Sequence, residues 1–109
     1  MNATLGNLEE MPLFRTLLDS LQDGLVLIQD GRIAFANVPS ARMLGYKVAD
    51  LTGHDIAGFV AAEDRERVVD NYRRRMAGED VPTAYAVKLR RKDGGACVVH
   101  VIVNRCEDG

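Results

Sequence analysis

Two Asp-Gly pairs constrain the fold more than any other feature of this sequence. Asp30-Gly31 and Asp93-Gly94 each lie between two short segments rich in apolar residues. An Asp-Gly pair tolerates the positive φ of a tight turn, so such pairs between apolar segments predict β-hairpins. We therefore expect two hairpins, one in each half of the chain. Their strands are predicted near residues 24–30, 32–37, 84–90 and 97–105.

Helical patterns fill the rest of the chain. Leucines at i, i+3 and i+4 spacing predict an amphipathic helix of about ten residues over 13–21, ended by Asp23-Gly24. A longer helix is expected over 62–77, because acidic residues occupy its first turn and arginines its last. Glycines interrupt the segment between the first hairpin and this helix, which predicts several short turns there. The apolar positions of the long helix are Val68, Val69, Tyr72 and Met76.

The order of these elements predicts class α+β, an antiparallel sheet with helices on one face. Composition agrees with one soluble domain. The chain has 109 residues, of which 47% are hydrophobic and 28% charged, with a net charge of −2. That balance gives no general attraction for nucleic acid. The longest apolar runs fall far short of the roughly 20 residues that a membrane span needs. No secretory signal opens the sequence, so we expect a cytoplasmic protein without membrane insertion.

The sequence carries no signature of a metal site or of catalysis. Cys97 and Cys106 are nine residues apart, with only His54 and His100 as nitrogen ligands, so zinc-binding spacing is missing. A nucleophilic triad would be hard to build from these side chains. We therefore predict no catalytic residue and no metal, and interpret both cysteines as free thiols.

Four segments resemble the motifs of the PAS domain, a sensory module of bacterial signalling proteins. Residues 36–46 (ANVPSARMLGY) are similar to the segment after the second strand of the family. Residues 51–56 (LTGHDI), 62–65 (AEDR) and 90–94 (RRKDG) resemble its Leu-x-Gly turn, the acidic start of its long helix and its second hairpin turn. These motifs occur in the right order, and the resemblance covers roughly residues 13–109.

The resemblance implies a five-stranded antiparallel sheet with short helices over one face, around a small pocket. Such a domain implies a sensor upstream of a histidine kinase, a cyclic-dinucleotide synthase or a transcription regulator. Residues 1–12 would be a linker or helical extension, and 13–109 the PAS domain. The family places its fifth strand between the first and fourth, whereas this sequence supplies four. We expect a domain cut before its last strand, compensated by the fourth strand or by a neighbouring molecule.

The resemblance also bears on cofactors. Photoactive flavin is not expected, because residues 55–60 lack the cysteine of the flavin-binding members. Haem is not expected either, because residues 62–78 contain no histidine to ligate iron. An unidentified small ligand stays open.

Two interpretations of the function compete. In the first, the domain senses a ligand or partner and signals through homodimer contacts to an output domain in the same parent chain. In the second, it is a dimerisation module with a filled core. His100 is either a residue at the rim of a packed face or a pH-sensitive contact, and Asn37 either an anchor for the ligand or only a helix cap. The candidate pocket residues, which could equally form plain core, are Leu27, Phe35, Asn37, Met43, Leu44, Phe59, Tyr72, Val87 and Val101. The candidate dimer residues are Leu13, Leu17, Leu21, Val98, His100 and Ile102.

Overall fold

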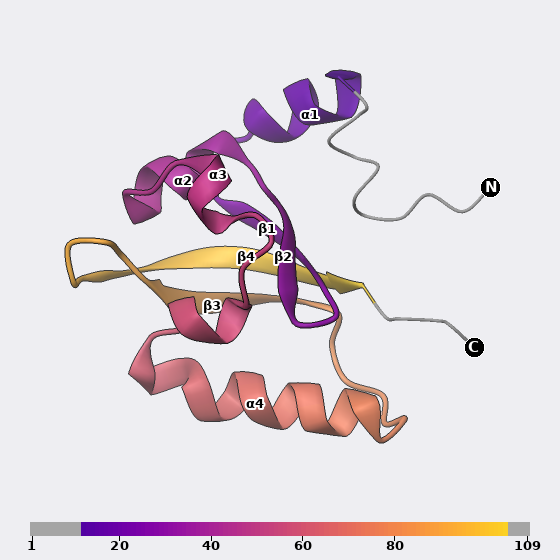
Figure 1. Cartoon of the computed structure of the whole chain (residues 1–109). Coiled ribbons are helices and arrows are strands. Elements are labelled where there is room, and N and C mark those ends of the chain that lie inside the picture. Colours follow the sequence, from indigo (N-terminus) through magenta and orange to yellow (C-terminus); the bar gives the residue numbers. More distant parts are fainter. Residues whose placement is uncertain (1–11, 105–109) are drawn as a thin grey trace.

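The structure is a computed structural model that describes residues 12–104 of the chain (Figure 1). It therefore leaves Cys106 and nearly all of the expected extension over residues 1–12 outside the described part. The elements, in chain order, are α1 (Pro12–Asp19), β1 (Leu25–Gln29), β2 (Arg32–Ala36), α2 (Val38–Leu44), α3 (Val48–Leu51), the 3-10 helix η2 (Ile56–Phe59), α4 (Ala62–Met76), β3 (Ala84–Arg90) and β4 (Ala96–Asn104). The α+β class and both predicted hairpins are confirmed.

Both hairpin turns use the predicted Asp-Gly chemistry. Asp30 and Gly31 have φ values of 55° and 78°, the left-handed backbone that joins β1 to β2. Gly94 has a φ of 95°, and the carboxylate of Asp93 accepts the amide of Gly95 at 2.9 Å. The local sequence therefore fixes where each strand pair reverses.

The sheet is mixed, which corrects the expectation of an antiparallel sheet. The strand order is β2-β1-β4-β3, and β1 runs parallel to β4, with Val26 opposite Val101. A parallel pair needs a long crossover connection, and the segment from α2 to β3 supplies it. Strand β4 thus lies directly beside β1, at the position that the resemblance gives to a fifth strand. This is one of the two ways in which we expected the missing strand to be replaced.

One face of the sheet carries the core. This inner face presents buried apolar side chains from all four strands to residues of α2, α3 and η2, and α2 and α3 lie together beside it (Figure 1). On β4 the alternation is clean, since Val99 and Val101 are buried whereas Val98 and Ile102 are 52% and 40% exposed. The outer face of β4 is therefore left uncovered by the described residues.

Both edges of the sheet are occupied by other backbone or side chains. Along β2, the amide of Ile33 donates to the carbonyl of His54, and the amide of Gly53 donates to the carbonyl of Ile33. Along β3, Val60 pairs with Leu89 and α4 follows immediately. The edges therefore offer no free row of hydrogen-bonding groups where these segments cover them.

Two helices differ from their predicted form. The first ends at Asp19 rather than at residue 21, and Gly24 does not adopt a left-handed cap. Gly24 instead permits a close approach, because a Cβ there would lie 3.1 Å from the Cα of Ser40 on α2. Helix α4 matches its predicted range, but three of its four apolar positions are exposed: Val69, Tyr72 and Met76.

Candidate functional site

Asn37 forms the junction between α1, the sheet and α2. Its side-chain oxygen accepts the amides of Leu25 at 2.9 Å and Ser40 at 3.0 Å. Its side-chain nitrogen donates to the carbonyls of Leu18 at 2.8 Å and Asp23 at 3.1 Å. These four bonds use the full hydrogen-bonding capacity of the amide. Asn37 is fully buried. Its bond to Ser40 makes it the N-cap of α2, and its bond to Leu18 connects it to α1.

Asp19 adds a second tie at this junction. Its carboxylate accepts the amide of Val38, the first residue of α2, at 2.9 Å. It also lies 3.8 Å from the guanidinium of Arg15, whose charge is 5.9 Å from the centre of the Phe35 ring. The end of α1 is therefore connected to the start of α2 mainly through polar side chains.

The candidate pocket residues lie in different parts of the described fold. Leu44, Val87 and Val101 belong to the core cluster on the inner face, with Phe59 packed against it. Leu27 and Phe35 face each other across β1 and β2, are buried and lie outside that cluster. The remaining candidates are half-buried Met43, exposed Tyr72 and the saturated Asn37.

A hollow of about 680 Å³ runs along α4 and is largely open to solvent. It mixes acidic and basic side chains with one exposed valine, and none of the candidate pocket residues lines it. Its lining residues are Ala62, Arg65, Glu66, Val69, Asp70 and Arg73.

The candidate dimer residues are all exposed to solvent. Leu13, Leu17 and Leu21 follow one another at four-residue intervals along α1 and the turn after it. Val98, His100 and Ile102 share the outer face of β4, where alternation sets them opposite the buried Val99 and Val101. The structure thus gives two exposed apolar surfaces, one on α1 and one on β4.

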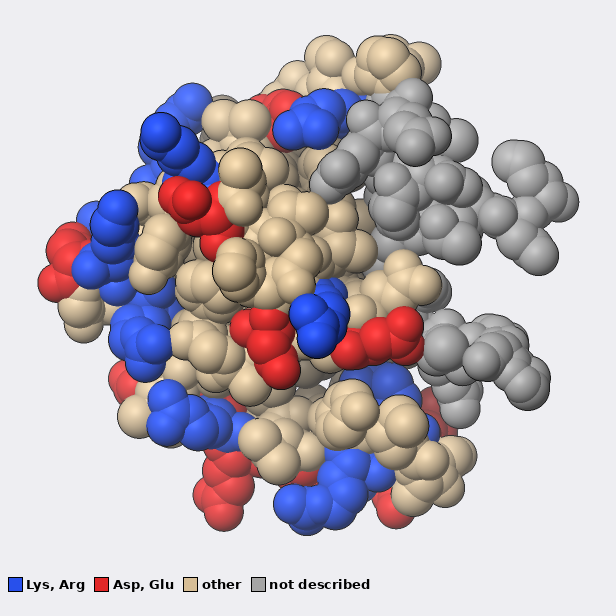
Figure 2. Space-filling view, in the orientation of Figure 1, with Lys and Arg blue, Asp and Glu red and all other residues tan. Residues whose placement is uncertain are grey.

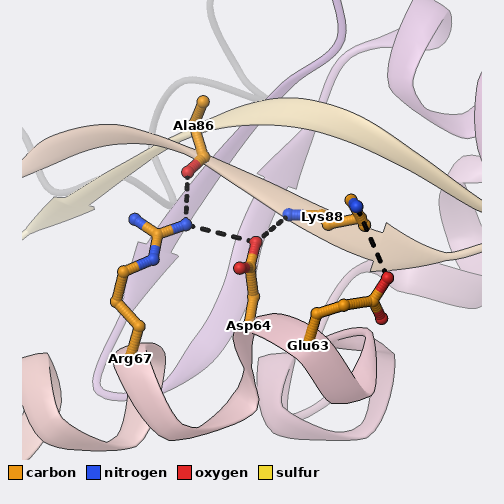
Figure 3. A network of polar contacts seen from close by, with 5 residues as sticks. All are labelled: Glu63, Asp64, Arg67, Ala86 and Lys88. Atoms are coloured by element: carbon orange, nitrogen blue, oxygen red, sulfur yellow. Dashed lines mark hydrogen bonds and ion pairs between the residues drawn. The ribbon is translucent and has the colours of Figure 1, made fainter.

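Helix α4 is attached to the outer edge of β3 by a polar network (Figure 3). The carboxylate of Asp64 accepts the amide of Lys88 at 2.7 Å, and the amide of Ala61 donates to the carbonyl of Lys88 at 2.9 Å. The guanidinium of Arg67 donates to the carbonyl of Ala86 at 2.8 Å and to Asp64 at 3.2 Å. Glu63 pairs with the ammonium of Lys88 at 3.4 Å.

These contacts shift the titration of two carboxyl groups. The amide of Lys88 holds the pKa of Asp64 below its ordinary value of 3.8, with Arg67 acting in the same direction. The pKa of Glu63 is lowered from 4.5, first by its own backbone amide and then by Lys88. Both groups are therefore charged at neutral pH, as the network requires.

The sequence did not indicate that this network exists. It assigned Asp64 to the acidic first turn of a helix, which explains its charge but not its partner. The available signal was the spacing of Asp64 and Arg67, which places both on one side of the helix. That a strand edge lies beside them depends on the tertiary fold.

The remaining reactive side chains form no metal site among the described residues. No group of three or more His, Cys, Asp or Glu side chains is placed to hold an ion in this part of the chain. His54 is exposed, with its ring 6.5 Å from that of Phe59. Cys97 is a free thiol, and burial raises its pKa.

On the face seen in Figure 2, basic and acidic side chains are interspersed among uncharged residues, and the basic ones do not gather into one surface. Within residues 12–104, no helix has the length and apolar character that crossing a membrane requires.

Comparisons with known proteins agree on one family. The family model described as PAS fold matches residues 13–109. No protein with a curated description matches the chain. Among solved structures, the PAS domain of an HTR-like protein from Haloarcula marismortui is 25% identical, with a TM-score of 0.59, over 84% of this chain and 75% of that one.

Two further structures share the fold. A PAS domain from Desulfitobacterium hafniense is 19% identical, with a TM-score of 0.53, over 76% of this chain and 77% of that one. A PAS domain from a two-component sensor histidine kinase is 14% identical, with a TM-score of 0.59, over 84% and 78%.

Proposed function

The chain belongs to the PAS fold family, and from that premise we propose that it is the sensory and regulatory module of a larger signalling protein. In this proposal it responds to a small ligand or a partner. It passes the signal through homodimer contacts to an output domain of the same parent chain, such as a histidine kinase or a cyclic-dinucleotide synthase. The module itself catalyses no reaction. We propose further that residues 13–109 are the functional unit and that it works in the cytoplasm.

The observation that carries the proposal is the pair of exposed apolar surfaces on α1 and β4. Large apolar side chains that remain exposed together are typical of interfaces. Leu17 is 55% exposed and Val98 is 52% exposed, so a second copy could cover both. The Asn37 junction ties α1 to the strand β1 and the helix α2, so a displacement of α1 would act on the sheet.

An interaction module with a filled core is the second candidate. It is supported by Asn37, whose four hydrogen bonds leave no group free for a ligand. It is also supported by the inner face, where Leu44, Val87 and Val101 pack in one cluster. A sensing pocket, in contrast, would have to open between these side chains and Phe59.

Two measurements test these proposals. Analytical ultracentrifugation should give a dimer for the wild-type chain, and Leu17→Glu or Ile102→Glu should shift it to monomer by placing charge in the interface. Thr16→Glu is the matched control, because Thr16 is exposed on the same helix beside the leucines. A wild-type chain that stays monomeric at every concentration would contradict signalling through a homodimer.

Native mass spectrometry distinguishes between a ligand-binding sensor and an interaction module with a filled core. A small molecule that copurifies in a one-to-one ratio supports ligand sensing. A protein mass that equals that of the polypeptide, together with dimer formation, supports the interaction module instead.

A further inference from the structure

The edge of β3 that faces away from β4 is covered by two side chains of α4 and by the backbone of the segment before it, where Val60 pairs with Leu89. The amide and carbonyl of Lys88 and the carbonyl of Ala86 point away from β4, because all three bond to the α4 side. Their partners are Asp64, Ala61 and Arg67, which we name the edge cover. Without it, β3 would present the unpaired groups with which sheets extend.

Asp64 and Arg67 of the edge cover belong to α4, which is weakly attached elsewhere, and Ala61 is the N-cap residue before that helix. None of the fifteen residues of α4 is buried, and Tyr72 and Met76 are exposed. Its other contacts with the fold include Arg75 to the carbonyl of Pro82 and Arg65 to the carbonyl of Val60. Elements that bury few apolar contacts open at lower free energy than the core does. Helix α4 is therefore placed to open while the sheet stays folded.

The exposed edge would suit a second copy of the same strand. An antiparallel pair centred on Val87 sets Lys88 against Ala86 and Arg90 against Ala84, so no two like charges are directly opposite. The same register sets Tyr85 against Leu89 and extends the inner face across both copies. Because Ala86 and Lys88 both point outward, they would exchange hydrogen bonds in this register.

We propose that Ala61, Asp64 and Arg67 are a removable cover on the β3 edge, and that release of α4 together with residues 60–61 before it lets β3 pair with β3 of a second copy. This association uses a strand edge. It therefore goes beyond the homodimer proposed above, which uses α1 and the outer face of β4.

Hydrogen exchange and sedimentation of the full chain test this inference. In Asp64→Asn/Arg67→Gln, the Lys88 amide should exchange about 10-fold faster or more, because its carboxylate acceptor is replaced by a weaker one and the cover is loosened. The amides of Val87 and Leu89, which lie within the β3–β4 ladder, should change little. The same variant should self-associate at lower concentration than the wild type. Asp70→Asn/Arg73→Gln is the matched control, since it removes the same two charges from α4 at an exposed ion pair.

A proline separates edge pairing from association through the outer face. Ala86→Pro, added to the double variant, removes an outward amide and leaves the ladder to β4 intact, so it should abolish the added association. Ile102→Glu in the same background should not abolish it, whereas that substitution alone should break the proposed homodimer. Association that survives Ala86→Pro, or faster exchange without association, would overturn the edge inference. If the double variant fails to fold, Arg67→Gln alone should show both faster exchange of the Lys88 amide and self-association at lower concentration. Unchanged exchange of the Lys88 amide in Arg67→Gln would then overturn the inference.

Discussion

Helices α2 and α4 are attached to the same sheet by opposite means. Helix α2 has seven residues, and four of them are buried: Pro39, Ser40, Ala41 and Leu44. Helix α4 has fifteen residues and none of them is buried. The shorter helix is therefore part of the core, whereas the longer one is joined to a strand edge by charged side chains. The length and charge order of a helix thus say little about how firmly it is held.

The largest expected effect is at the cap of α2. Asn37→Ala removes four hydrogen bonds and leaves the buried amide of Ser40 without its side-chain acceptor. Such a loss typically costs 1–3 kcal/mol for each stranded group, so we expect the free energy of unfolding to fall by about 4 kcal/mol. Urea denaturation measures the change. Asn71→Ala on α4 is the control and should cost less than about 0.5 kcal/mol. A similar loss of unfolding free energy in both variants would contradict the difference in attachment between α2 and α4.

Apolar truncations should show the same contrast with a smaller effect. Leu44 is 1% exposed, and Leu44→Ala should cost about 3 kcal/mol through lost burial and a cavity. Met76 is 69% exposed, and Met76→Ala should change stability by less than about 0.5 kcal/mol. Thermal or urea unfolding of the two variants in parallel compares them. A Met76→Ala loss close to that of Leu44→Ala would show that α4 is packed in solution.

The smallest effect is the acid dependence of the α4 attachment. The pKa of Asp64 is lowered in the fold, so its contribution is present above the ordinary value of 3.8 and is lost as the pH falls through the lowered pKa. Urea midpoints between pH 7 and pH 3 should therefore decline, and Asp64→Asn should remove part of that decline. An equal decline in Asp64→Asn would assign the acid sensitivity to other carboxyl groups, such as Asp93, whose pKa is also lowered, first by the amide of Gly95.

Local chemistry made much of the fold predictable. Asp30-Gly31 and Asp93-Gly94 set both hairpins, and the charge order of α4 set its range. These signals work because a turn or a helix end is satisfied by residues close in sequence. The four short motifs were sufficient to identify the family for the same reason.

Long-range placement was not accessible from local patterns. The parallel pairing of β1 with β4 joins segments that share no sequence signal. The register shift between Leu27 and Ile28 and the placement of Leu27 opposite Phe35 separated these residues from the rest of the predicted pocket. Asn37 was identified as a polar residue of interest, but its bonds to Leu18 and Asp23 depend on where α1 ends.

The pairing of Val26 with Val101 also constrains when the sheet can be completed during synthesis. A ribosome releases the β1–β2 hairpin long before β4 has been made. Until then, the side of β1 that β4 will occupy has no strand beside it, and contacts of this sequence separation form slowly. The edge of β1 that faces β4 therefore stays unpaired while residues 37–95 are being made. This interval, rather than the finished fold, is where we expect chaperones to be needed.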